Sequence, residues 1–361
     1  MRSRRAIRAI TVVTLLALMA AFGFGVNRLI ASRKAKIPSQ TSSYAPTATR
    51  PTIILPGTLY LAQGGQLYSL SDGYFTSLHS STSAGKWMEP AFVPGTQNIV
   101  AVLRADEYSN MFLLTSQGKV IRQLSNNAAP ASKVTHVWLN HWMFWPHFGP
   151  TGTLYFAYDK PKNSTTLAVD FSIWSGSLTG TLANQQLTTG NLFTGGDVDP
   201  TPMANGDVMF SRYSISNGNA FSFIALVTKP LVQPTILSTG AQDCGQAAPS
   251  PDGTMVAMIC IGGTGLQSTR LEVAPLVGTK LGTPRTLVNN CLCSAPVWAP
   301  DGSGLAYYNA TDTAGHFELW WIKGALTATP ASPLQVTTNL DFDATSPPSW
   351  SPLTSIPVMT R

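Results

Sequence analysis

The chain has 361 residues, of which 44% are apolar, so a single domain of about 300 residues can bury a substantial core. Charged residues make up only 11%, far below the ~25% typical of soluble domains, which suits a protein that works outside the cytoplasm. Nine of the 23 Lys and Arg residues but none of the 17 acidic residues lie at or before Arg50, so the remaining chain is slightly acidic and nucleic-acid binding is not expected.

The first 56 residues resemble a membrane-targeting segment followed by a linker. Residues 1–8 contain four arginines, and the uncharged run Ala9–Val26 is long enough for a transmembrane helix. The basic cluster predicts that residues 1–8 stay in the cytoplasm and that the rest of the chain lies outside. Residues 27–56 include a Pro/Ser/Thr-rich spacer. We expect a single-pass signal anchor in the cell membrane; cleavage near Gly25, giving a secreted protein, is the alternative.

Beyond the linker, one phrase occurs six times: an apolar or aromatic residue, a turn of Pro, Gly or Asn type, and an alternating apolar run. Pro-Asp-Gly between two apolar runs predicts an antiparallel hairpin, and a second strand pair follows. Four strands per repeat of ~40 to 50 residues are typical of a β-propeller. The turns open, at intervals of 47 to 56 residues, with Pro94, Pro150, Ala204, Pro251, Pro300 and Pro352.

The two ends of the repeated region complement each other. No second strand pair follows the sixth hairpin, whereas residues 57–79 have the second-pair pattern without a preceding hairpin. We expect these two pairs to form one shared blade, because the first and last blades would otherwise leave unpaired strand edges. The sequence therefore predicts an all-β, six-bladed propeller of four-stranded blades over residues 57–361, with the last blade closed by N- and C-terminal strands and a transmembrane helix in front.

The turn sequences resemble the WD40-like repeats of TolB-type propellers, in which Pro-x-Trp-Ser-Pro-Asp-Gly precedes an apolar strand. The best matches are PVWAPDG at Pro296–Gly302, PSWSP at Pro348–Pro352 and PSPDG at Pro249–Gly253. The resemblance covers about residues 57–361 and is weaker in the second to fourth blades. The small mixed domain that precedes the propeller in TolB itself has no counterpart, so the resemblance does not carry over a role in the Tol-Pal system.

All four cysteines lie in the last third of the chain, and in an exported protein they predict disulfides. Cys244 and Cys260 lie eight residues either side of Asp252, opposite each other across a hairpin, but Cys244 also aligns with Cys293 of the next blade. Because Cys-x-Cys rarely closes on itself, we favour pairing Cys291 and Cys293 with the other two, although the spacing leaves the connectivity open. A zinc site is a weaker alternative, because oxidised cysteines are poor ligands.

The segment HVWLNHWMFWPHFGP places His136, His141 and His147 among three tryptophans. A metal or sugar site can have this composition, but aromatic residues on innermost strands also wedge blades together, and we favour packing. The sequence contains no Gly-x-Ser-x-Gly elbow, phosphate-binding loop, dinucleotide fingerprint or His-Glu-x-x-His motif.

Residues five to nine before each turn begin the innermost strands, which gather at one mouth of the central channel. Carboxylates there would form a net-negative funnel for a cation, a basic peptide or a polar ligand, although acidic residues are also ordinary turn formers. We expect no catalytic residue, metal or cofactor; Ca²⁺ would require at least three converging oxygens. The candidate ligand-binding residues are Lys86, Glu89, His141, Trp145, Asp197, Asp199, Asp341 and Asp343.

We therefore expect a membrane-anchored, extracytoplasmic scaffold that binds an envelope or cell-surface protein, a peptide or a cell-wall glycan. The alternative is an enzyme at the channel mouth, such as a lyase, a lactonase or a metal-dependent hydrolase. An enzyme would require Asp197, Asp199, Asp341, Asp343 and His141 to point into one cavity. A purely structural role is the third possibility.

Overall fold

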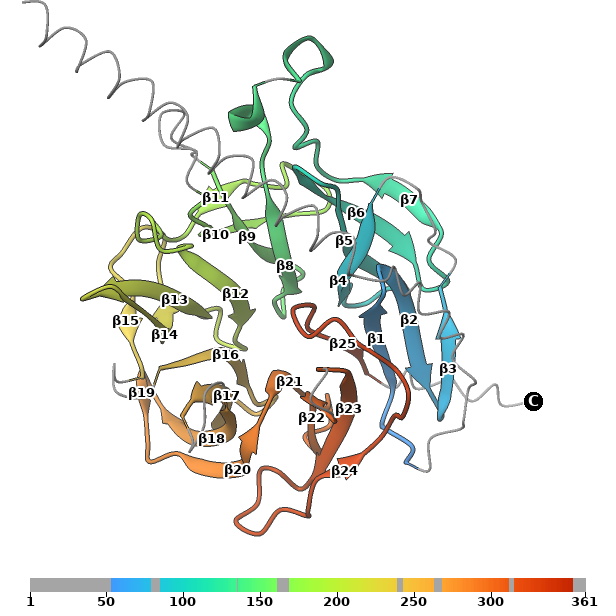
Figure 1. Ribbon diagram of the computed structural model, residues 1–361, viewed down its shortest axis with the longest axis vertical. Coiled ribbons are helices and arrows are strands. Elements are labelled where there is room, and N and C mark those ends of the chain that lie inside the picture. The colour runs from blue at the N-terminus through green and yellow to red at the C-terminus, as the bar shows by residue number, and fades with distance from the viewer. Residues whose placement is uncertain are drawn as a thin grey trace, which may run out of the picture. The chain divides into compact units, whose positions relative to one another are not determined.

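The computed structural model describes residues 53–78, 85–134, 136–160, 169–238, 243–262, 268–311 and 315–352. The proposed cytoplasmic segment, the anchor at Ala9–Val26 and most of the linker lie outside these ranges. Within them, no helix is both long and apolar enough to cross a membrane. The described strands form six sheets arranged as blades around a common centre, which confirms the six-bladed propeller (Figure 1).

Blades 1 to 5 each use strands that follow one another in sequence, with the first strand at the centre. Blade 1 consists of β4 (Lys86–Phe92), β5 (Asn98–Arg104), β6 (Ser109–Thr115) and β7 (Val120–Gln123). Blade 2 consists of β8 (Met143–Phe148), β9 (Leu154–Tyr158), β10 (Ser172–Gly176) and β11 (Gln185–Gln186), and it is preceded by the 3₁₀ turns η1 (Ala131–Lys133) and η2 (Val137–Leu139). Blade 3 consists of β12 (Asp197–Pro202), β13 (Val208–Ser216), β14 (Asn219–Val227) and β15 (Thr235–Ile236).

Blades 4 and 5 also run outwards from the centre in sequence order, but blade 4 has an additional strand. Blade 4 consists of β16 (Cys244–Pro249), β17 (Met255–Ile261), β18 (Thr269–Val277), β19 (Lys280–Leu281) and β20 (Arg285–Cys291). It has five strands because both β19 and β20 pair with β18. Blade 5 consists of β21 (Cys293–Trp298), β22 (Gly304–Ala310), β23 (Phe317–Lys323) and β24 (Leu334–Gln335).

Blade 6 joins distant parts of the chain, as the sequence predicted. It consists, from the centre outwards, of β25 (Ser349–Ser351), β1 (Thr58–Gln63), β2 (Gln66–Ser71) and β3 (Tyr74–Ser77). The strands β25 and β1 are antiparallel, with Leu59 opposite Trp350. Among the described residues, the division of the blade differs from the expected two strands from each end: the early segment supplies three strands and the late segment one. The β1 strand occupies the second position, which the sequence argument had given to the C-terminal hairpin.

The core lies between adjacent blades. Leu59, Leu61 and Leu70 of blade 6 are buried in one cluster with Trp321 of blade 5. The indole of Trp350 packs on Trp321, with ring centroids 5.8 Å apart. Closure of the ring therefore completes a hydrophobic interface as well as a sheet.

The innermost strands of blades 1 to 5 share one irregularity at their middle. There, two residues of the innermost strand stand opposite one residue of the second strand, which defines a β-bulge. A proline follows the first bulge residue in four of the five blades, where its missing N–H leaves no unpaired donor. The first bulge residues, all with positive φ, are Glu89 (51°), Trp145 (53°), Asp199 (55°), Gln246 (51°) and Ala295 (51°).

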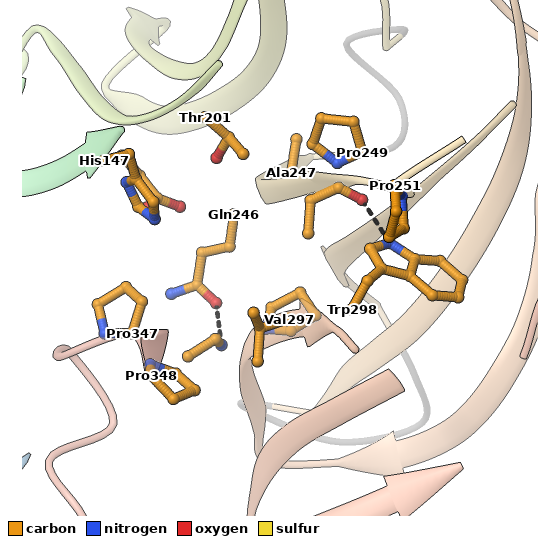
Figure 2. Close-up of a pocket in the computed structure, with 14 residues that line it drawn as sticks. His147, Thr201, Gln246, Ala247, Pro249, Pro251, Val297, Trp298, Pro347 and Pro348 are labelled. Atoms are coloured by element: carbon orange, nitrogen blue, oxygen red, sulfur yellow. Dashed lines mark hydrogen bonds between the residues drawn. The ribbon is translucent and has the colours of Figure 1, made fainter. Parts of the chain in front are cut away.

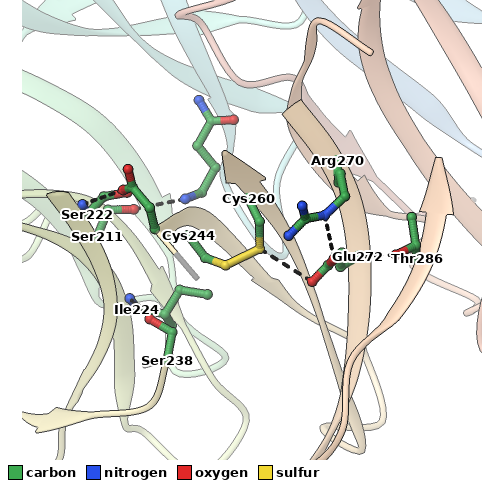
Figure 3. Close-up of a disulfide and its surroundings, with 11 residues drawn as sticks. Ser211, Ser222, Ile224, Ser238, Cys244, Cys260, Arg270, Glu272 and Thr286 are labelled. Carbon is green, nitrogen blue, oxygen red and sulfur yellow. Dashed lines mark hydrogen bonds and ion pairs between the residues drawn. A yellow bond between two sulfur atoms is a disulfide. The ribbon is translucent and has the colours of Figure 1, made fainter. Parts of the chain in front are cut away.

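All four cysteines form disulfides, and Figure 3 shows the first of them, Cys244–Cys260. These two residues face each other across the first hairpin of blade 4. The second disulfide joins Cys291 to Cys293. The preference for pairing these two with the other cysteines was wrong. Because β20 ends at Cys291 and β21 begins at Cys293, the chain turns between two blades at this point, and the two Cα atoms lie 5.2 Å apart, within the usual range for a disulfide.

Candidate functional site

The candidate site is a pocket of about 170 Å³ in the central channel, which we call the channel pocket. Residues from the innermost strands of blades 2 to 5, and from the segment that leads into β25, line it. The lining includes His147 of β8, Thr201 of β12, Gln246 of β16, Trp298 of β21 and Pro347 of blade 6 (Figure 2). Five of the six blades therefore contribute to one cavity.

The channel pocket lies toward the hairpin turns and not toward the mouth that the sequence argument favoured. Its lining begins at the bulges and continues to Pro251, in the turn that follows β16. The residues that begin the innermost strands, such as Lys86 and Asp197, do not line it. The bulges thus form the inner end of the cavity.

The walls of the channel pocket are rigid and largely apolar. Five prolines line it, at positions 249, 251, 296, 347 and 348, and none of them has an N–H to donate. The indole Nε1 of Trp298 donates a hydrogen bond to the carbonyl oxygen of Ala248 at 2.8 Å, which fixes the orientation of the ring. In such a cavity, a few polar side chains decide which ligand binds.

Two of the bulge side chains brace neighbouring blades. Glu89 Oε2 accepts a hydrogen bond of 2.6 Å from the backbone N–H of Trp145, the bulge residue of the next blade. Gln246 Oε1 likewise accepts a hydrogen bond of 2.8 Å from the N–H of Ala295. The amide nitrogen of Gln246 is consequently turned away from Ala295, toward the side of the pocket where Pro347 lies (Figure 2).

Asp199 occupies the same position in blade 3 but makes no such bond. Its side chain is one methylene shorter, and the N–H of Gln246, which it would have to reach, donates instead to Ser211 Oγ at 2.8 Å. The carboxylate lines the channel pocket, and Asp199 is only 8% exposed. Among the described residues it has no hydrogen-bond partner, and burial raises the pKa of Asp199 to about 7. This carboxylate therefore has no bracing role and changes its charge near neutral pH.

His147 is the second titratable residue in the lining. Its Nδ1 atom is buried and has no hydrogen-bond partner among the described residues. Burial lowers the pKa of His147 to about 4, against the opposing effect of the backbone carbonyls of Trp145 and Pro200, so the imidazole is neutral at pH 7. The channel pocket thus presents a carboxylate and a neutral imidazole, and no Lys or Arg lines it.

Neighbouring acidic residues influence the charge of Glu89, the bulge residue of blade 1. Burial raises the pKa of Glu89 well above its ordinary value, the N–H of Trp145 opposes this shift, and the charges of Asp343 and Asp199 add to it. Asp199 and Asp343 are thus both close enough to Glu89 for their charges to act on it. Among the described residues, however, no group of three or more His, Cys, Asp or Glu side chains is arranged to hold a metal ion.

The structure assigns different surroundings to the remaining predicted residues. Asp197 is fully buried, and its two carboxylate oxygens accept hydrogen bonds of 2.7 Å each from Nε and one terminal nitrogen of Arg212. His141 Nδ1 lies 2.9 Å from Asp159 Oδ1, outside the channel pocket. Lys86 is exposed at the start of β4.

The last two acidic candidates make local hydrogen bonds and do not line the channel pocket. Asp341 is exposed and accepts a hydrogen bond of 3.3 Å from the N–H of Phe317. Asp343 accepts hydrogen bonds from both the N–H and the hydroxyl of Thr345. Of the five residues that an enzyme at the predicted mouth would require, only Asp199 lines the channel pocket.

Gln246 carries no charge and so did not stand out in the sequence, and the tryptophans around His147 favoured a packing role for it. One signal was present: the five bulge residues all lie five positions before the residue that opens the following turn. The corresponding position in the sixth repeat is Pro347, which also lines the pocket. The equivalent positions of blades 3 to 6, Asp199, Gln246, Ala295 and Pro347, therefore line the pocket, whereas Glu89 and Trp145 do not.

The pH dependence of stability tests the burial of Asp199. Because its folded-state pKa lies above the unfolded value, ionisation opposes folding, and stability should fall as the pH rises from about 4 to 7. We expect Asp199→Asn to raise the free energy of unfolding by up to about 4 kcal/mol at pH 8 and to leave it nearly unchanged at pH 4. Urea unfolding at both pH values measures this. A variant less stable than the wild type at pH 8 would mean that the carboxylate has a stabilising partner.

Comparison with known proteins supports the fold. No protein-family model matches the chain, and no curated protein sequence matches it. TolB from Acinetobacter baumannii has a similar structure, with a TM-score of 0.54 and 15% identity over 82% of this chain and 67% of that chain. A chain of the nidogen/laminin complex has a TM-score of 0.53 and 12% identity over 81% of this chain and 98% of that chain.

Hydrazine synthase from Kuenenia stuttgartiensis is a third similar structure, with a TM-score of 0.57 and 12% identity over 83% of this chain. This chain spans about half of that one, 47% of its length. At such identities the similarity concerns the fold alone, and it agrees with the TolB-like propeller that the turn sequences predicted.

Proposed function

We propose that this chain, a propeller with the fold of TolB, is an extracytoplasmic binding scaffold that receives part of an envelope or cell-surface protein in the channel pocket. The observation that carries this proposal is the Asp199 carboxylate, which is buried in the pocket without a hydrogen bond to any described residue. The backbone N–H of Gln246 in blade 4, which Asp199 could have bound, donates its hydrogen bond to Ser211 Oγ instead. A buried ionisable group in a cavity with no bracing role is a candidate binding group.

The size of the channel pocket favours a macromolecular partner. At about 170 Å³ it is smaller than the ~300 to 1,000 Å³ that sites for drug-sized ligands occupy. It has room for one side chain or a group of similar size. We infer that the pocket recognises a single group, while the rest of the partner covers the face of the propeller around it. The nidogen/laminin complex is an example of the same fold in an assembly with another protein.

The proposal includes a location outside the cytoplasm, with residues 9–26 as the membrane anchor. The uncharged run and the arginines before it support the anchor. The two disulfides support an oxidising compartment, because cytosolic proteins rarely keep them.

Cross-linking in the envelope fraction tests the proposed function. Full-length wild type, Asp199→Asn and Asp341→Asn are compared; the last variant is the matched control, since Asp341 is exposed and lies outside the channel pocket. We expect the partner bands of the wild type to persist in the control and to fall about tenfold in Asp199→Asn, as for the loss of one charged contact. Equal cross-linking by all three proteins would contradict the proposal.

An enzyme at the same pocket is the second candidate. The pKa of Asp199, about 7, lies where a general base works best at neutral pH. Assays of the full-length protein on a panel of sugar lactones and uronate polysaccharides separate the two functions. An enzyme would show turnover that rises to a plateau above about pH 7 and that disappears in Asp199→Asn. A scaffold would show no turnover and would still cross-link to its partner.

A further inference from the structure

We propose that the channel pocket binds a cationic group, the ammonium or guanidinium of a Lys or Arg side chain on the partner. This inference rests on the proposed function and names the chemistry that its pocket recognises. Three properties of the pocket carry it: the sign of its charge, its unpaired hydrogen-bonding atoms, and the shape of its walls.

The charge of the channel pocket is negative without compensation from its own lining. Asp199 is the charged residue in the lining, and the lining contains no Lys or Arg. Glu89 lies near enough to feel the charges of Asp199 and Asp343, with Arg104 as the cation acting on it. Arg212, the cation nearest in sequence, is already bound to Asp197, and neither residue lines the pocket. A ligand cation would therefore supply the missing counter-charge.

The unpaired atoms of the pocket are mostly acceptors. Both oxygens of Asp199 accept, and the neutral ring of His147 has one acceptor nitrogen. His147 Nδ1 has no hydrogen bond among the described residues, although the backbone carbonyls of Trp145 and Pro200 act on the ring. Gln246 uses its oxygen on Ala295, so its amide nitrogen is the donor left beside these acceptors. An ammonium offers three N–H donors and a guanidinium five, with no acceptor of their own. A carboxylate or phosphate ligand would face Asp199 without a cation to hold it.

The walls suit the methylene stem of a long basic side chain. Trp298 presents its ring while its N–H is occupied by Ala248, and the prolines add apolar surface without donors. Lys and Arg bury such stems along apolar surfaces while their charged ends contact polar groups. The volume of about 170 Å³ has room for one such side chain.

The proposal predicts a specific pH dependence. The titratable groups around Asp199 are His147 from β8, Glu89 from β4 and Tyr213 from β13, whose pKa is raised by burial and by the charges of Asp199 and Asp243. A cation binds the ionised form of Asp199. With a pKa of about 7, that form grows from roughly one tenth at pH 6 to nine tenths at pH 8, so affinity should rise about tenfold over this interval and then level off.

Selection from a random peptide display library tests the inference on the full-length protein. We expect peptides selected on the wild type and on Asp341→Asn to share a Lys or Arg at one position, and Asp199→Asn to select no such residue. A selected peptide is then synthesised with its basic residue replaced by norleucine, which keeps the stem and removes the charge. Calorimetry at pH 8 should show at least tenfold weaker binding, about the loss expected for a buried charge pair. This second comparison does not depend on the folding of any protein variant.

The outcomes separate this inference from the proposed function. A consensus without a basic residue, still dependent on Asp199, would leave the scaffold standing and overturn the cationic ligand. Equal affinity for the norleucine peptide, or an affinity that does not change between pH 6 and pH 8, would also overturn it. A wild type that enriches no peptide above background would count against both.

Discussion

Deletion of residues 57–78 is expected to abolish cooperative folding and not merely to lower the melting temperature. The deletion removes β1, β2 and β3, three of the four strands of blade 6. It leaves β25 without its neighbour and exposes the apolar faces of blades 1 and 5 that Leu59, Leu61 and Leu67 cover. These three leucines are fully buried. A ring with an open gap would retain unpaired edges and a large exposed apolar surface.

Calorimetry and near-ultraviolet circular dichroism of the deletion variant measure this. Deletion of residues 37–50, within the Pro/Ser/Thr-rich spacer, is the control and should leave the melting transition unchanged. A smaller change tests the same interface: Leu61→Ala should cost about 2 to 5 kcal/mol of the free energy of unfolding. A soluble deletion variant with a single sharp transition would show that the other five blades are stable without closure.

Replacement of Arg212 by methionine is expected to destabilise the propeller by about 3 to 5 kcal/mol, the usual cost of removing one partner of a buried ion pair. Arg212 donates hydrogen bonds to both carboxylate oxygens of Asp197 and to the carbonyl oxygen of Thr189. Burial raises the pKa of Asp197 and Arg212 opposes that shift, so the lone carboxylate would be left buried without a counter-charge.

Urea unfolding at pH 7 measures the loss, and a double variant identifies its cause. Asp197→Asn combined with Arg212→Met removes the orphaned charge and should recover most of the stability, because two neutral partners cost less than one buried ion. If the double variant were no more stable than Arg212→Met alone, the loss would come from packing or from the bond to Thr189.

The turn residues made it possible to predict the fold from the sequence. Pro, Asp and Gly at fixed intervals predicted the hairpins, their spacing predicted six blades, and the unmatched ends predicted a shared blade. The division of that blade was not predictable from pattern, because residues 57–79 and the last hairpin both alternate in the way that a second strand requires. Pairing between strands so distant in sequence depends on packing, here that of Trp350 on Trp321.

The bulges explain why the site was harder to predict than the fold. Asp197 and Asp199 lie two residues apart, so regular alternation would place both side chains on the same face of β12. The bulge begins at Asp199 with a positive φ and changes the direction of its side chain. Asp197 consequently binds Arg212, whereas Asp199 lines the channel pocket. Their charge and their distance from the turn identified Asp197 and Asp199 as candidates. These properties could not predict that Asp197 pairs with Arg212 while Asp199 lines the pocket.

Blade 6 combines three early strands with one late strand, so the propeller ring cannot close until the late strand has been synthesised. Leu59 pairs with Trp350, 291 positions later. At about 5 to 20 residues per second, the ribosome makes the partner of β1 roughly 15 to 60 seconds after β1 itself. Throughout that time the first three strands have an open edge and the nascent ring cannot close. Blades 1 to 5 can form one after another as they emerge, whereas β1 keeps an unpaired edge until β25 has been made.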